Sequence, residues 1–278
     1  VAASCSFDSK PVNRKIPNQI TLSKVIKSKS KIIVAVIDTG ADLSHNDLKG
    51  SLWTGKNGQH GWNFVDNNSD VSDDMGHGTH IAGIIRSTEA NISLMILKYY
   101  SSRPGSQKDA YENSLKAIRY AIDNGANIIN YSGGGEGAST EEFELLREAE
   151  SKGIIVVSAA GNESSDMDAK PYYPASYRLS NIITVASVDA KGKLSHESNY
   201  GSVVDTTAPG EDIYSSLPGN EHGYMTGTSQ ATAYVTAQVA TAKSLNPKWN
   251  YKKIKQTVLA SLTSTAQKNI YLAKALSE

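Results

Sequence analysis

The heptapeptide GTSQATA at Gly227–Ala233 opens a long run of small residues that continues to Lys243. No glycine or proline interrupts the run from Thr228 onward, so it predicts a helix that begins directly after Gly227. Small side chains allow close packing, and we therefore expect a buried central helix. A hydroxyl at its start would meet unpaired backbone N–H groups and the positive end of the helix dipole. Ser229 could act there as a nucleophile, or Thr228 or Ser229 could simply cap the helix.

Around this run, the overall composition is that of a globular protein. The chain has 278 residues, of which 39% are hydrophobic and 20% charged, so it can form one α/β domain or two smaller ones. The 28 basic and 28 acidic residues cancel, and we expect no nucleic-acid partner. No apolar run has the length of a transmembrane helix. Cys5 is the only cysteine, which excludes an internal disulfide and a cysteine metal cluster.

Apolar runs alternate with amphipathic segments along most of the chain. Nearly continuous apolar runs predict strands buried on both faces, at 32–37, 92–97, 126–131, 154–159 and 182–188. Helical patterns lie between them, at 77–86, 110–124 and 140–151. This alternation predicts a mostly parallel sheet with helices on both faces, which binds ligands beyond the carboxyl ends of its strands.

The two ends of the chain have weaker patterns. Residues 1–20 contain two prolines and no sustained period, so we expect an irregular N-terminal arm on the surface, followed by a single domain at 21–278. A short helix is expected at 22–27. Short strands are expected at 203–206 and 213–214, and further helices near 251–261 and 267–276.

An acid and a base stand at the ends of predicted elements. Asp38 directly follows the first strand, where it could act chemically or simply start a turn. His77 lies between two glycines, which suits a place where backbone or substrate passes closely. It could be a catalytic base or an ordinary core histidine. His80 follows three residues later, but zinc hydrolases place two helical histidines four apart with a glutamate between them, so we expect no zinc site here and a local hydrogen bond for His80.

Two further polar segments follow buried strands. Asn162 comes after the 154–159 strand, and its amide can donate to a developing oxyanion without adding charge, although an ordinary loop asparagine would look the same. The segment Ser132-Gly133-Gly134 follows the 126–131 strand. Its backbone could pair with an extended peptide, or it could be a flexible connection.

Four short blocks carry a resemblance to a known family. They are IDTG at 37–40, HGTHIAG at 77–83, AGNE at 160–163 and GTS at 227–229. Together and in this order, over roughly residues 32–261, they resemble the signature blocks of the subtilisin-like serine proteases. Tyr173-Pro174 resembles another family element, which is often a cis peptide bond.

The resemblance implies a three-layer α/β fold and a serine endopeptidase that acts on peptide or protein substrates. Asp38, His77 and Ser229 would form the catalytic triad, and Asn162 with the Ser229 N–H would form the oxyanion hole. Further roles would fall to two groups of residues: Ser132, Gly133 and Gly134 would pair with the substrate backbone, while Ala159, Ala160 and Gly161 would line the primary pocket. No cofactor or metal is required for this chemistry.

The same resemblance implies a secreted or cell-envelope location and the possibility of an inhibitory propeptide. Two other functions are compatible with it. One is a peptide ligase or transacylase that uses the same site, and the other is a relative that binds peptides without cleaving them.

Three positions depart from the family pattern. Ala233 stands where proline is expected, which predicts a roomier site and a changed partition of the acyl-enzyme between water and amines. Gly133 replaces a larger residue, which predicts relaxed apolar selectivity. Asp47 matches a carboxylate of the family's calcium site, but the segment that would supply its partners is short. We therefore expect that strong site to be absent, and a weak structural calcium site elsewhere stays open.

Overall fold

The computed structural model describes residues 7–8, 31–87, 91–104 and 106–262. Its centre is a sheet of seven parallel strands in the order β3-β4-β2-β5-β6-β7-β8. The strands are β2 (Ile32–Asp38), β3 (Gly61–Asn63), β4 (Ile92–Lys98), β5 (Ile128–Tyr131), β6 (Ile155–Ala159), β7 (Ile182–Val188) and β8 (Thr206–Pro209). The predicted parallel sheet is therefore confirmed.

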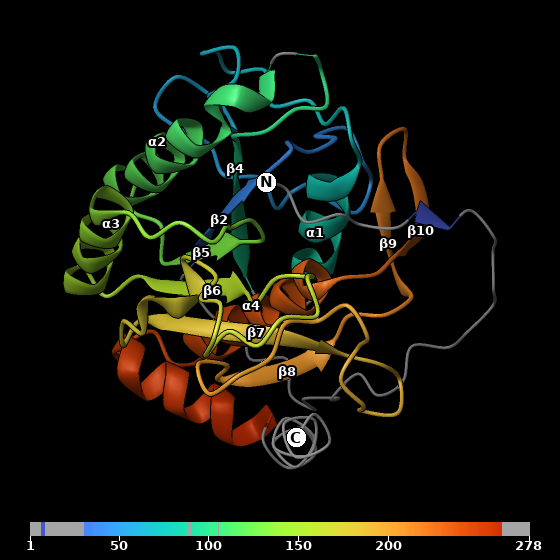
Figure 1. Ribbon diagram of the computed structural model, residues 1–278. Coiled ribbons are helices and arrows are strands. Elements are labelled where there is room, and N and C mark those ends of the chain that lie inside the picture. Colours follow the sequence, from blue (N-terminus) through green and yellow to red (C-terminus); the bar gives the residue numbers. More distant parts are fainter. Residues whose placement is uncertain (1–6, 9–30, 88–90, 105, 263–278) are drawn as a thin grey trace.

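Helices cover both faces of this sheet (Figure 1). They are α1 (His77–Arg86) and α4 (Thr228–Leu245) on one face, and α2 (Ala110–Asp123) and α3 (Thr140–Ser151) on the other. Strand β2 shows the division, because its side chains alternate between the two faces. Val34 and Val36 belong to the core cluster that includes α1 and α4, whereas Ala35 and Ile37 belong to the cluster that includes α2 and α3. The fold is a three-layer α/β fold.

Helix α4 is the buried central helix that the sequence predicts. It contacts β5, β6, β7 and β8, and its residues Ala231, Ala233, Val235 and Val239 are fully buried. Its N-cap residue is Gly227, with no side-chain cap hydrogen bond. Neither Thr228 nor Ser229 is therefore the capping residue, and both hydroxyls take part in other contacts.

A second, antiparallel sheet lies beside α1, in the order β1-β10-β9 (Figure 1). It consists of β1 (Phe7–Asp8), β9 (Ile213–Leu217) and β10 (Glu221–Met225). The sequence predicts only β9, because β10 is polar and mostly exposed, as is usual for a strand without a buried face. The N-terminal arm was expected to be irregular, but Phe7–Asp8 pairs with β10.

Other predictions are shifted or lie outside the described residues. The strand expected at 203–206 begins at Thr206, which is the first residue to pair with β7. Residues 251–262 are helical, as expected, and short 3₁₀ helices lie at Ser106–Asp109 and Ala175–Tyr177. The helices expected at 22–27 and 267–276 lie outside the described residues.

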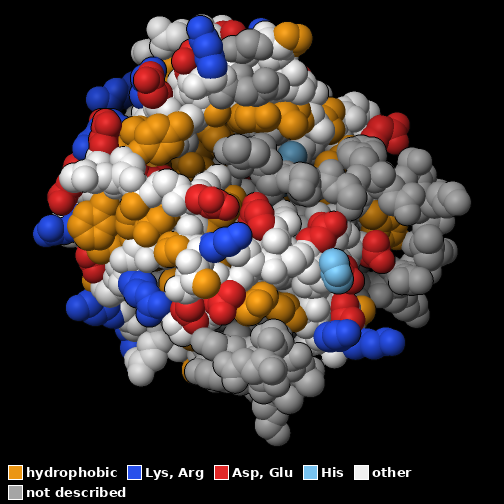
Figure 2. Space-filling model, viewed as in Figure 1, with side chains coloured by type: hydrophobic (Ala, Val, Ile, Leu, Met, Phe, Trp, Pro, Cys, Tyr) orange, Lys and Arg blue, Asp and Glu red, His pale blue; other side chains and the backbone are white. Residues whose placement is uncertain are grey.

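The surface of the described part carries mixed charges. On the face shown in Figure 2, acidic and basic side chains are intermingled over the α2 and α3 side of the molecule. Among the described residues, no helix has the length and apolar character needed to cross a membrane.

Candidate active site

Asp38 and His77 form a short hydrogen bond at the edge of the sheet. Asp38 is the last residue of β2 and His77 is the first residue of α1. Nδ1 of His77 lies 2.6 Å from Oδ1 of Asp38, and the side chains are 15% and 3% exposed. Because a carboxylate only accepts hydrogen bonds, Nδ1 carries the proton. The neutral ring then has its lone pair on Nε2, which is the form required of a general base.

Close backbone contacts hold these two residues in place. A Cβ added to Gly78 would lie 2.1 Å from the carbonyl oxygen of Gly40, so only glycine permits the two loops to approach. The glycines beside His77 predict such a close approach of another backbone segment.

The carboxylate of Asp73 ties the same loops together. Its Oδ1 accepts from Thr39 Oγ1 at 2.8 Å and from the Gly76 N–H at 2.9 Å. Its Oδ2 accepts from the Thr79 N–H at 2.8 Å and from Oγ1 of the same residue at 2.6 Å. Thr39 Oγ1 in turn accepts from the Gly78 N–H at 2.9 Å. Asp73 thus fixes both ends of the Asp38–His77 pair, a role that the sequence analysis missed.

His80 is fully buried one turn further along α1. Its Nε2 lies 3.0 Å from the carbonyl oxygen of Ile213 and 3.2 Å from that of Gly223. The prediction of a local hydrogen bond is therefore wrong, because α1 packs against the second sheet and His80 reaches across to it. Burial, followed by the charge of His77, lowers the pKa of His80 to about 4. This histidine is neutral at ordinary pH and has a structural role.

Ser229 lies at the second position of α4, where backbone N–H groups have no intrahelical partner. It is fully buried, and its hydroxyl donates to the carbonyl oxygen of Ser132 at 3.3 Å. Ser132 directly follows β5, the strand next to the one that ends at Asp38. The structure therefore places Ser229 at the carboxyl edge of the sheet, as the sequence predicts.

Asn162 joins this group through Thr228, the first residue of α4. Its Oδ1 accepts from the Thr228 N–H and from Thr228 Oγ1, both at 2.9 Å. Its Nδ2 is buried and has no hydrogen-bond partner among the described residues. A buried donor without a partner costs free energy, so its place here requires an explanation. A ligand oxygen would supply the missing acceptor.

Comparison with known proteins gives this constellation a context. The model of the subtilase family, Peptidase_S8, matches residues 29–273. The chain belongs to the subtilase family. The chain is 36% identical over 250 residues to the major intracellular serine protease of Bacillus subtilis (strain 168), which covers 84% of this chain and 75% of that protein. It is 38% identical over 212 residues to thermitase of Thermoactinomyces vulgaris, with 73% and 71% covered.

A solved structure agrees with these relatives. A cold-adapted subtilisin-like serine proteinase superimposes with a TM-score of 0.74 at 28% identity, covering 86% of this chain and 85% of that one. This subtilase is therefore a subtilisin-like serine protease, and the resemblance seen in the sequence is confirmed. The Tyr173-Pro174 peptide bond is cis, as that resemblance implies.

The segment predicted to pair with the substrate follows β5. A Cβ added to Gly133 would lie 2.3 Å from the Tyr99 hydroxyl oxygen, and one added to Gly134 would lie 2.4 Å from the carbonyl oxygen of Tyr173. The space left by the small residue at 133 is thus filled by Tyr99. The departure from the family pattern at this position does not simply open the site, because a tyrosine from the adjoining β4–α2 segment occupies the room.

Beside this segment the subtilase surface is hollowed. The hollow has a volume of about 450 Å³, and it is lined mainly by tyrosines and glycines together with Glu142 of α3. Burial raises the pKa of Glu142 to about 7, although a hydrogen bond from Tyr177 opposes this shift. The burial of Glu142 could not be predicted from the sequence, because acids are common in the first turn of a helix and Glu142 is one of two in that turn of α3.

The residues predicted for the primary pocket lie at the end of β6. Ala159 and Ala160 are 1% and 0% exposed, and the Gly161 N–H donates to Thr228 Oγ1 at 3.2 Å. Their contribution to a pocket stays a prediction.

Gln230 of this subtilase follows Ser229 and was assigned no role from the sequence. It is fully buried, and neither of its amide atoms has a hydrogen-bond partner within the part of the chain that the structure describes. A Cβ added to Gly227 would lie 3.1 Å from Gln230 Oε1 and 3.2 Å from Asn162 Nδ2. Two buried amides therefore lie beside the backbone two residues before the nucleophile candidate.

Proposed function

We propose that this subtilase hydrolyses peptide bonds with Ser229 as nucleophile, His77 as general base and Asp38 as the group that orients His77. The observation that carries the proposal is the buried 2.6 Å hydrogen bond between Asp38 and His77, on the same edge of the sheet as the start of α4. Each remaining step of the reaction has a candidate group nearby.

The first step is attack by the Ser229 oxygen on the substrate carbonyl. Nε2 of His77 takes the hydroxyl proton as the new C–O bond forms, and it gives that proton to the leaving amine as the C–N bond breaks. Water then attacks the acyl group on Ser229, with His77 again taking and returning the proton, which releases the acid and restores the hydroxyl. Asp38 accepts the Nδ1 hydrogen bond throughout, so it holds the ring in the required tautomer and stabilises the imidazolium.

The second requirement is a site for the negative oxygen of the tetrahedral intermediate. Asn162 Nδ2 is a buried donor that no described residue satisfies, and the Ser229 N–H lies in the first turn of α4. We propose that these two donors receive the oxyanion. The backbone of Ser132, Gly133 and Gly134 would hold the substrate as an added strand, and Ala159, Ala160 and Gly161 would form the primary pocket.

All of these steps use protein groups and water, so we propose that the reaction needs no cofactor and that activity is resistant to chelators. An extracytoplasmic location and an inhibitory propeptide stay predictions, and the Bacillus subtilis relative is named as an intracellular protease.

Labelling with a fluorophosphonate tests the nucleophile directly. The wild type should become modified at Ser229, and Ser229→Ala should lose both the label and activity, with kcat falling about 10⁶-fold as in subtilisin itself. Ser244→Ala is the matched control, since Ser244 is another buried serine of the same helix and should leave labelling intact. Cleavage of a peptide library by Ser229→Ala at the wild-type rate would end the proposal.

A further inference from the structure

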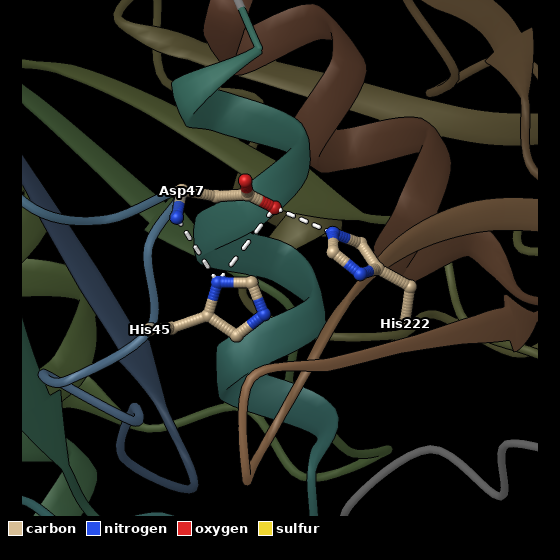
Figure 3. A group of neighbouring side chains, drawn as sticks. All are labelled: His45, Asp47 and His222. Carbon is tan, nitrogen blue, oxygen red and sulfur yellow. Dashed lines mark hydrogen bonds and ion pairs between the residues drawn. The ribbon is translucent and has the colours of Figure 1, made fainter.

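A second histidine–carboxylate cluster lies away from the proposed catalytic groups. His45 and Asp47 come from the loop after β2, and His222 comes from β10 (Figure 3). One nitrogen or oxygen atom from each residue lies within 4.8 Å of the other two. Oδ2 of Asp47 is 2.7 Å from Nε2 of His222 and 3.7 Å from Nδ1 of His45. Three atoms that commonly bind metals thus converge on one point.

His45 is held so that Nδ1 carries its lone pair. The side chain is fully buried, and its Nε2 lies 3.0 Å from the carbonyl oxygen of Glu221. A carbonyl can only accept, so Nε2 carries the proton and Nδ1 carries the lone pair. Metal-binding histidines are commonly oriented in this way by a backbone carbonyl. Nδ1 accepts the Asp47 N–H at 3.1 Å, and a metal at this position would take the place of that hydrogen bond.

Asp47 is oriented by a neighbouring hydroxyl. Ser216 Oγ donates to its Oδ2 at 2.7 Å. The side chain is 45% exposed, so solvent and ions can reach it. Hydrogen bonds to a coordinating carboxylate typically orient it for the metal.

His222 completes the cluster from the other side. Its ring stacks on Tyr214 with centroids 5.5 Å apart and planes 13° apart, and it meets the His45 ring edge-on at 5.1 Å. The side chain is 35% exposed. The ring is therefore oriented but able to shift slightly. Nε2 donates to Asp47 Oδ2 at 2.7 Å, so a metal would displace this proton to solvent and leave the remaining ring proton on Nδ1.

We propose that His45, Asp47 and His222 form a binding site for a divalent transition metal of the zinc type, with water as a fourth ligand. Tetrahedral zinc with ligands at about 2.0–2.2 Å requires ligand atoms roughly 3.3 Å apart. The observed separations from Asp47 Oδ2, 2.7 Å and 3.7 Å, lie on either side of that value. Two imidazoles and one carboxylate suit zinc and its neighbours, whereas calcium requires six to eight oxygen ligands.

The position of the site gives the metal a structural effect. It would connect the loop that follows β2 to the hairpin of β9 and β10, two segments that are also joined by hydrogen bonds. His45 lies seven residues after Asp38 and His222 seven residues before Ser229. A bound metal would therefore stabilise the segments next to Asp38 and Ser229, without itself taking part in the reaction.

Zinc titration of the full chain tests the site, with Ser229→Ala as the background to prevent self-digestion. Calorimetry should show one equivalent of Zn²⁺ bound, with a rise in Tm, and Co²⁺ should give the absorption bands of a tetrahedral histidine site. His222→Gln should weaken binding by more than about 100-fold. His196→Gln removes an exposed histidine outside the cluster and should bind like the background protein.

A second variant avoids the buried His45, whose loss risks unfolding the loop. Ser216→Ala removes only the hydroxyl that orients Asp47 and should weaken Zn²⁺ binding about 10- to 100-fold. Unchanged zinc binding in His222→Gln would overturn the proposal, because it would place the metal elsewhere, for example at His77. A Tm that rises with Ca²⁺ and not with Zn²⁺ would overturn it as well.

Discussion

Two aspartate–histidine pairs in this subtilase have almost the same length but different surroundings. Asp38 and His77 are 2.6 Å apart with side chains 3% and 15% exposed, whereas Asp47 and His222 are 2.7 Å apart with side chains 45% and 35% exposed. Distance alone therefore does not separate the proposed catalytic pair from another kind of site. Burial and the neighbouring groups make the difference.

The residues around the two pairs differ in kind. The buried pair lies at the carboxyl edge of the parallel sheet, where Ser132 follows β5 and accepts a hydrogen bond from Ser229 of α4. It is shielded from water, which strengthens its electrostatic interaction. The exposed pair instead has a second histidine and a serine hydroxyl around its carboxylate. The first arrangement suits proton transfer, and the second suits coordination of a cation.

The largest effect is expected from Asp38→Asn. An amide cannot hold His77 in the same tautomer, and kcat should fall about 10⁴-fold in a peptide-cleavage assay, the loss known for a serine protease with this substitution. Asp47→Asn should act through stability and metal binding, lowering Tm rather than kcat. An equal loss of kcat in both variants would show that the two pairs do not differ in role.

A smaller effect is expected from the amide that faces the proposed oxyanion. Asn162→Ala should lower kcat about 10²- to 10³-fold with little change in KM, as found for subtilisin itself. Asn162→Asp separates the two functions of this side chain. It keeps the acceptor for Thr228 but loses the donor, so it should retain Tm and still lose activity. Activity retained in Asn162→Asp would assign the oxyanion to another group.

Burial should also make the free energy of unfolding depend on pH through two groups outside both pairs, Glu142 and His80. Their contributions have opposite signs. The pKa of Glu142 is raised from 4.5 to about 7, so between these values the folded state holds a proton that the unfolded state has lost, and stability falls as pH rises. The pKa of His80 is lowered from 6.5 to about 4, so stability from this group rises over nearly the same range. The two contributions largely cancel.

Removing the titrating group of Glu142 should leave the pH dependence that His80 contributes to stability. Urea unfolding of Glu142→Gln in a Ser229→Ala background should show stability rising by about 3 kcal/mol from pH 4 to 6.5, from 1.36 kcal/mol per pKa unit. Glu144→Gln, an exposed acid of the same helix, should keep the flat profile of the parent. Parallel profiles for the two variants would show that Glu142 titrates normally.

The smallest effect is expected at Ala233, the departure from the family proline. Its N–H lies four residues beyond Ser229, so proline there would remove the hydrogen bond to the Ser229 carbonyl and crowd it. Ala233→Pro should change the partition of the acyl-enzyme between hydrolysis and aminolysis by about 0.5 kcal/mol, roughly twofold. Unchanged partitioning would remove any reason to consider ligase activity.

The sequence alone determined the layers of the fold and the place of each proposed catalytic group. Buried parallel strands and amphipathic helices have strong local periods, and strands such as β7 and helices such as α1 and α3 were predicted to the residue. Asp38, His77 and Asn162 follow from the same patterns, because the ends of such elements meet at one edge of the sheet.

Only the tertiary structure decided the contacts that join distant segments. The polar strand β10 has no period to reveal it, and it exists because it pairs with β9. The role of Asp73, the long reach of His80 and the meeting of His45 with His222 depend on residues that are far apart in the chain. The local sequence pattern predicts which side chains of a segment are buried. The partner of a buried or charged side chain depends on how distant segments pack together, and no single segment holds that information.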